Sequence, residues 1–218
     1  MFYQKILQLM YPAHCVDCSQ LIAPSAILCV QCAGSLKPVV SFYLPLTQKK
    51  SLKVVASYAY QDAARSLLIK KFSQNSLASK QLAQLMLQTI APENLQADYI
   101  IPIPLHWTRY AQRGFNQSTE IARVISKQTQ VPMIQLLKRK KRTKFQSRLS
   151  KDQREHNLDD AFDLKRWYGY RDLSFLEQKN IILIDDLCTT GATLKSAAQS
   201  LLPLKPLSLT AIVACRAL

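Results

Sequence analysis

The chain has 218 residues, 48% of them hydrophobic and 20% charged, a composition that suits one α/β core with a small appendage and excludes a disordered protein. Its 29 Lys and Arg against 14 Asp and Glu give a net charge of +15, which favours a polyanionic partner, nucleic acid or an anionic membrane surface. We find neither a membrane-spanning apolar stretch nor a secretory signal in the sequence, so we expect a cytoplasmic protein.

Two C-x-x-C motifs near the start of the chain indicate a metal site. They supply Cys15 and Cys18, then Cys29 and Cys32, and each pair can hold two thiolates on one face of a tight turn. Four sulfurs complete a tetrahedral shell, so we predict a structural zinc of the zinc-finger type, with a redox pair as the alternative. His14 could replace Cys15 as a ligand, but we expect it to be a nearby surface residue.

The next segment, residues 37–50, has the composition of a linker. It contains Pro38, Pro45 and a lysine pair, and prolines of this kind interrupt regular structure. We therefore predict a zinc-binding module with its linker at residues 1–50 and a second domain at residues 51–218.

Apolar periodicity in the second domain alternates between strand and helix. We expect strands at 54–60 and 99–103, with one helix beginning at residue 65 and another at 79–90 between them. Strand and helix alternation of this kind builds a parallel sheet with helical crossovers, so the fold class is α/β.

A basic segment, residues 105–118, follows the second of these strands. It contains Arg109 and Arg113 and leads into an amphipathic helix that carries Ile121 and Ile125. A strand, a basic loop and a helix start together are typical of anion binding. The alternative is a surface loop whose arginines are merely solvated.

Residues 138–154 contain nine basic residues and one acid, and they are poor in apolar residues. We expect a mobile loop that can close over a phosphate site or follow a single-stranded DNA backbone, with a solvated charge run as the alternative. Trp167, Tyr168 and Tyr170 follow, available for stacking on bases or for packing. The candidate nucleic-acid contacts are Lys138, Arg139, Lys140, Lys141, Arg142, Lys144 and Arg148.

The most informative stretch runs from residue 181 to residue 193. It begins with four apolar residues, typical of a strand covered on both faces, and continues with Asp185 and Asp186 at the strand's carboxyl end, where ligands bind in α/β sheets. A loop of small residues follows, whose backbone N–H groups can surround an anion at the start of the next helix. These loop residues are Thr189, Thr190, Gly191, Ala192 and Thr193.

The two acids would repel that anion, so we expect them to accept hydrogen bonds from hydroxyl groups or to hold a hydrated Mg²⁺. A Walker B-like pair, a phospho-acceptor aspartate and a capped helix are the alternatives. The Walker A sequence that would accompany a Walker B pair occurs nowhere in the chain.

Residues 181–193 resemble, without a gap, the phosphoribosyl-pyrophosphate (PRPP) motif of the type I phosphoribosyltransferases. This resemblance implies a type I phosphoribosyltransferase-like parallel sheet flanked by helices. It implies catalytic roles for Asp185 and Asp186. It also implies that the small-residue loop binds the phosphate of a Mg²⁺-bound PRPP and that Arg109 and Arg113 face the pyrophosphate.

The whole chain resembles the ComF family of competence-associated, phosphoribosyltransferase-like proteins. The resemblance implies handling of incoming single-stranded DNA in natural transformation, with other competence proteins such as a DNA-uptake helicase as possible partners. The residues that carry it are the four cysteines, Pro102 and Pro104, Arg113 to Gln117, Thr143, Gln146, Arg154, Asn157, Ala161, Phe162 and residues 181–193.

Two functions follow from these residues. The protein is either a binding module that holds single-stranded DNA or PRPP, or a Mg²⁺-dependent phosphoribosyltransferase that passes through an oxocarbenium-like state to a nucleobase or amine acceptor. The charge and the basic run favour binding, whereas the intact loop allows both.

Overall fold

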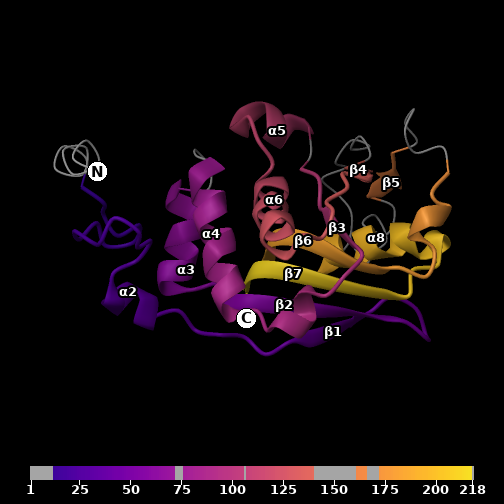
Figure 1. The fold of residues 1–218 in the computed structure, drawn as a ribbon, viewed down its shortest axis with the longest axis horizontal. Helices are drawn as coiled ribbons and strands as arrows, with labels where there is room; N and C mark the ends of the chain where they lie inside the picture. Colours follow the sequence, from indigo (N-terminus) through magenta and orange to yellow (C-terminus); the bar gives the residue numbers. More distant parts are fainter. Residues whose placement is uncertain (1–11, 72–75, 106, 140–160, 166–171, 218) are drawn as a thin grey trace, which may run out of the picture.

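The computed structural model describes residues 12–71, 76–105, 107–139, 161–165 and 172–217. Their central feature is a five-stranded sheet in the order β1-β2-β7-β6-β3 (Figure 1). Strands β2, β7, β6 and β3 are parallel, and β1 is an antiparallel strand at one edge. The strands are Phe42–Pro45 (β1), Ser51–Ala59 (β2), Tyr99–Pro102 (β3), Asn180–Cys188 (β6) and Ser208–Arg216 (β7).

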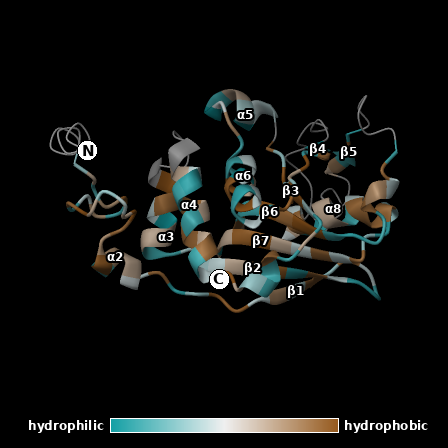
Figure 2. Ribbon diagram, in the orientation of Figure 1, coloured by the Kyte–Doolittle hydropathy of each residue, from teal (hydrophilic) through white to brown (hydrophobic). Residues whose placement is uncertain are grey.

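The sheet is covered on both faces, as the apolar run in β6 predicted. Ile182 and Ile184 belong to one buried cluster, and Ile181 and Leu183 belong to another on the opposite face. This alternation follows from the two-residue period of a strand. Strands β6 and β7 are accordingly coloured mainly hydrophobic in Figure 2.

One face of the sheet carries most of the helices. Ile121 and Ile125 of α6 and Leu82 and Met86 of α4 are fully buried in the cluster on this face. Among the described residues no helix is both long and apolar enough to cross a bilayer. The elements of this layer are α3 (Asp62–Ser66), a π-helical turn (Leu67–Lys71), α4 (Ser76–Thr89) and α6 (Gln117–Thr129).

The opposite face is covered by α8 (Ala192–Leu201) and by a small two-stranded sheet. Leu194 and Leu201 of α8 pack in the second buried cluster together with Leu137 and Phe162. The small sheet pairs β4 (Leu137–Arg139) with β5 (Phe162–Leu164) in antiparallel register. Short 3₁₀ turns lie at Pro92–Leu95, Ser174–Leu176 and Leu202–Leu204.

The N-terminal cysteine module packs against the helical face of the sheet. Its short helix α2 spans Val30–Gly34, and Val16 and Leu28 are buried in the same cluster as the helices. The linker expected at residues 37–50 is only partly irregular, because Phe42–Pro45 forms the edge strand β1. The division into two domains at residue 50 stays a prediction.

Two segments expected as loops contain regular structure. Within residues 105–118, the segment Trp107–Arg113 forms helix α5, so Arg109 and Arg113 lie on a helix. The basic run begins inside β4 with Lys138 and Arg139, because antiparallel pairing with β5 extends the chain there.

Asp98 joins the beginnings of β3 and β6. Its carboxylate accepts a hydrogen bond from the backbone N–H of Asn180 at 2.8 Å and another from Lys179 Nζ at 3.2 Å. These two donors hold the pKa of Asp98 below its usual value, and the backbone N–H of Asn180 has the larger effect. The contact fixes the register of two strands that are more than eighty residues apart in the chain.

Candidate functional site

The strand order predicts a ligand-binding crevice between the carboxyl ends of β3 and β6, and we refer to this edge of the sheet as the crevice. These strands are neighbours, but β3 is followed by α6 on one face of the sheet and β6 by α8 on the other. In open α/β sheets such a reversal leaves a crevice at the strand ends, where ligands bind. All the candidate acids, hydroxyls and loop residues considered below lie at or near this edge.

The acid pair lies within the second half of β6, which continues to Cys188 instead of ending before the acids. Both carboxylates are partly buried. Asp185 Oδ1 accepts a hydrogen bond from the hydroxyl of Ser118 at 2.9 Å and another from the backbone N–H of Asp186 at 3.0 Å. Ser118 is in the first turn of α6, so this hydrogen bond joins the two sides of the crevice.

The environment of the acids disfavours two negative charges. Burial and the charge of Asp186 raise the pKa of Asp185 to about 8, against the opposing hydrogen bond from Ser118. Burial also raises the pKa of Asp186, against the opposing charge of Arg113. A cation or a set of hydroxyl donors brought by a ligand would relieve this cost, so the pair is suited to a hydrated Mg²⁺ or a diol.

The small-residue loop connects the acids to α8 through a tight left-handed turn. Gly191 adopts a φ of 79°, and a Cβ there would come within 2.6 Å of a methyl group of Leu44 on β1. Helix α8 begins at the next residue, so its amino end faces the crevice. Two of the loop N–H groups have weak local acceptors: that of Ala192 points to the Thr190 hydroxyl at 3.4 Å, and that of Gly191 to the Cys188 thiol. A phosphate oxygen is a stronger acceptor than either.

Of the two predicted arginines, Arg113 is connected to the site. The charge of Arg113 lowers the pKa of Asp186, and its side chain is half-buried, whereas Arg109 is exposed on the same short helix. Asn116 holds the turn between α5 and α6 through hydrogen bonds from its amide to the carbonyl of Ile103 and the hydroxyl of Thr119, both at 2.9 Å.

Sequence reasoning missed two partners of Asp185. One is Ser118, which stood at the boundary of the basic segment without a role. The other is Arg139, whose charge acts on Asp185 from β4. Serine and arginine are too common for their residue type alone to indicate contacts with an aspartate that lies 67 and 46 positions away in the sequence.

The four cysteines of the module form a compact cluster. All four sulfurs lie within 4.8 Å of one another, and those of Cys18 and Cys29 are 3.7 Å apart. Thiolates bound tetrahedrally at about 2.3 Å from zinc would be about 3.8 Å apart, so the cluster fits this metal and is too wide for disulfides. Burial opposes ionisation of Cys15, but backbone N–H groups outweigh it and lower the pKa of Cys15 to about 6. His14 is exposed and its ring contacts the carbonyl of Ser19 at 2.8 Å, away from a ligand role.

Only two of the candidate nucleic-acid residues lie in the described part of the chain. Lys138 Nζ is 4.0 Å from a carboxylate oxygen of Asp163, and the Arg139 guanidinium lies over the Phe162 ring at 5.4 Å from its centroid. The other five, Lys140, Lys141, Arg142, Lys144 and Arg148, lie outside the described residues, as do the aromatics Trp167, Tyr168 and Tyr170.

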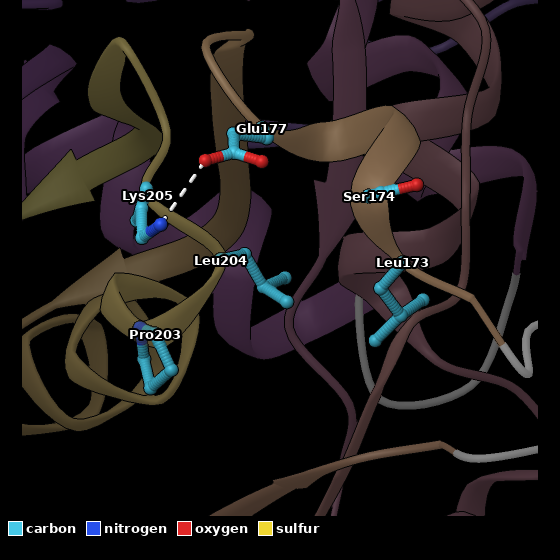
Figure 3. Close-up of a pocket in the computed structure, with 6 residues that line it drawn as sticks. All are labelled: Leu173, Ser174, Glu177, Pro203, Leu204 and Lys205. Carbon is cyan, nitrogen blue, oxygen red and sulfur yellow. Dashed lines mark hydrogen bonds and ion pairs between the residues drawn. The ribbon is translucent and has the colours of Figure 1, made fainter.

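Two surface cavities lie at the opposite, amino-terminal edge of the parallel strands. The smaller, of about 260 Å³, is bounded by Leu173, Leu204 and an ion pair between Lys205 and Glu177 at 3.3 Å (Figure 3). The larger, of about 390 Å³, lies beside the β1–β2 turn. Neither cavity contains any of the predicted site residues.

The fold and the site define an α/β protein with a mostly parallel sheet, flanking helices, an acid pair before a small-residue loop, and an N-terminal four-cysteine cluster. The chain is 32% identical over 203 residues to the DNA utilization protein YhgH of Escherichia coli O157:H7, covering 86% of this chain and 83% of that protein. It is 29% identical over 206 residues to competence protein ComFC of Bacillus subtilis, covering 84% and 80%.

A third relative, competence protein F of Haemophilus influenzae, is 35% identical over 106 residues, which are 47% of this chain and 43% of that protein. No family model matches the chain. Among solved structures, the allosteric regulatory enzyme of purine biosynthesis aligns with a TM-score of 0.42 and 16% identity over 63% of this chain and 25% of that one, too remote to support an argument. These relatives show that the chain belongs to the family of the DNA utilization protein YhgH and the competence protein ComFC, the ComF family.

Proposed function

We propose that the protein binds PRPP and single-stranded DNA in the cytoplasm during DNA uptake in natural transformation. The observation that carries the proposal is the crevice at the carboxyl ends of β3 and β6. There the acid pair, supported by Ser118, stands beside the Gly191 turn and the amino end of α8. The names of the relatives, competence and DNA utilization proteins, supply the biological setting.

PRPP matches the chemistry of the crevice part by part. The 5-phosphate is an anion for the backbone N–H groups of residues 189–193 at the start of α8. The ribose hydroxyls are donors for Asp185 and Asp186, whose pKa values are raised by burial and, for Asp185, by the charge of Asp186. A hydrated Mg²⁺ would accompany the pyrophosphate, with Arg113 beside it.

The PRPP site is tested by replacing both acids with amides, Asp185→Asn together with Asp186→Asn. The change keeps the shape but removes the charge and part of the acceptor capacity, so calorimetry in the presence of Mg²⁺ should detect no PRPP binding. The control is Asp172→Asn, which alters an aspartate that caps Ser174 at the opposite edge of the sheet and should bind PRPP normally. Equal affinity for PRPP in the double mutant and the wild type would show that the acid pair is not part of a PRPP site.

Single-stranded DNA is supported by the net charge of +15 and by the basic residues 138–154. Lysines and arginines that neutralise phosphates release counterions, so the slope of log K against log salt should approach −0.7 per phosphate contacted. Partner proteins, such as a DNA-uptake helicase, belong to the same proposal.

Alanine replacement of five successive basic residues tests the DNA contact. Fluorescence anisotropy at several salt concentrations should give a slope flatter by several contacts, whereas Trp167→Ala should weaken binding equally at every salt. An unchanged slope and affinity in the five-fold mutant would leave the segment a solvated charge run. The residues replaced are Lys138, Arg139, Lys140, Lys141 and Arg142.

A second candidate function is Mg²⁺-dependent phosphoribosyl transfer to a nucleobase or amine. The specific observation in its favour is that the charge of Arg113 lowers the pKa of Asp186, since a positive charge near the acid pair would stabilise a departing pyrophosphate. Incubation of the protein with PRPP, Mg²⁺ and a panel of bases decides between the two: release of pyrophosphate that depends on one base supports transfer, and binding without turnover supports the module.

A further inference from the structure

Helix α5, at Trp107–Arg113, is short and exposes large aromatic side chains to solvent. None of its seven residues is buried, and even its two large aromatic side chains are exposed, Trp107 to 65% and Tyr110 to 52%. Isolated helices this short are marginal in water, and large aromatic side chains normally gain stability by burial. In Figure 1 the helix stands away from the sheet, beyond α6. A surface of this kind is typical of a binding site.

The aromatic and basic side chains of α5 occupy adjacent faces of the helix. Trp107 and Tyr110 are three residues apart, and Arg109 and Arg113 are four apart, so the members of each pair lie side by side at about 5–6 Å between Cβ atoms. On the basic face Arg113 is half-buried and Arg109 is exposed, and the charge of Arg113 lowers the pKa of Asp186. Trp107 and Tyr110 on the adjacent face are both exposed, on a helix that follows the carboxyl end of β3.

We infer that α5 is a stacking platform for single-stranded DNA, on which Trp107 and Tyr110 receive successive bases while Arg109 contacts the phosphate backbone. Single-stranded DNA is favoured over an acidic peptide because it alone supplies both chemistries: flat π-faces for the aromatics and regularly spaced phosphates for the arginine. The inference rests on the proposed DNA binding and gives it a site that is independent of residues 138–154.

The chain allows a direct optical test, because it contains only two tryptophans. In a Trp167→Phe variant, Trp107 is the sole tryptophan, so its fluorescence reports on α5 alone. Titration with oligo-dT should quench this emission to saturation, at the same midpoint as anisotropy of a labelled strand. Poly-glutamate is the probe for the acidic-peptide alternative, and quenching by poly-glutamate but not by oligo-dT would overturn the inference.

Substitutions separate stacking from charge. Tyr110→Ala should weaken oligo-dT binding by about 5- to 150-fold at every salt concentration without changing the salt slope, the range expected for loss of one stacked base. Arg109→Ala should flatten the slope by about 0.7. Tyr43→Ala is the matched control, since Tyr43 is 64% exposed but lies on β1 beside the cavity at the opposite edge, and it should bind normally.

The outcomes distinguish the inference from the proposed function. If the wild type binds oligo-dT while Trp107 emission stays constant and Tyr110→Ala binds as tightly as Tyr43→Ala, the platform is wrong and DNA binding stands. If the wild type does not bind oligo-dT, both are wrong. Loss of fold cannot imitate the effect, because α5 buries no side chain and the thermal midpoint of Tyr110→Ala should match that of the wild type.

Discussion

The turn at Gly191 offers a quantitative test of how the candidate loop is held. Replacement by alanine places a side chain in the left-handed region at φ 79°, which costs about 1–2 kcal/mol. The new Cβ would also lie 2.6 Å from a methyl group of Leu44. This clash adds about 1 kcal/mol, the low end for overpacking, because the atoms in the way belong to the end of a partly buried side chain. We expect Gly191→Ala to lower the free energy of unfolding by about 2–3 kcal/mol.

Gly114 provides the matched control. Its φ is 73°, but among the described residues nothing lies within 4 Å of a Cβ built there, so Gly114→Ala should carry the backbone cost alone. Urea unfolding should therefore find Gly191→Ala less stable than Gly114→Ala by about 1 kcal/mol, or about 2–4 °C in a thermal melt.

A double-mutant cycle isolates the contact itself. Leu44→Ala removes the clashing methyl groups, so the cost of Gly191→Ala in that background should fall to the value measured at Gly114. If the two glycine substitutions cost the same and Leu44→Ala shows no coupling to Gly191→Ala, the close packing of β1 against the loop is wrong.

Three further predictions concern the metal cluster, a strand contact and the acid pair. Cys15→Ser with Cys29→Ser should reduce zinc from about one to none per chain in metal analysis, while Cys188→Ser keeps it. Asp98→Asn should remove part of the acid sensitivity seen by urea unfolding: the folded pKa is lowered, so the stabilisation is present above about pH 4 and lost as pH falls through the folded pKa. A wild-type pH profile in this variant would contradict it. Ser118→Ala should weaken PRPP binding about tenfold by calorimetry, and unchanged affinity would refute the positioning role.

The sequence alone determined the features that depend on residues close together in the chain. The apolar run 181–184 has no polar position, which predicts a strand buried on both faces, and its residues do alternate between two clusters. The four cysteines are set in two local pairs, and their sulfurs do gather within 4.8 Å. Helices α4 and α6, with apolar residues every three or four positions, formed near the expected positions, because burial of that face stabilises them. The helix expected from residue 65 instead begins at Asp62 and continues as a π-helical turn from Leu67.

Elements without a local pattern could not be found in this way. Strand β1 is four residues with a proline, and it is extended because it pairs with β2. Lys138 and Arg139 are in a strand because β5 pairs with them from more than twenty residues away. Helix α5 has no buried face, so its sequence contains no hydrophobic periodicity from which the helix could be predicted.

The candidate site was decided mostly by tertiary structure. The acids and the loop are contiguous and could be read from residues 181–193, but their surroundings could not. Ser118 donates a hydrogen bond to Asp185 from 67 positions away in the chain, and Leu44 of the edge strand β1 packs beside Gly191. The Ser118 contact depends on the strand order, which places the carboxyl ends of β3 and β6 side by side, and the Leu44 contact depends on the position of β1 at the other edge of the sheet. Residue types fix the chemistry of a group, whereas only the folded topology fixes which groups meet.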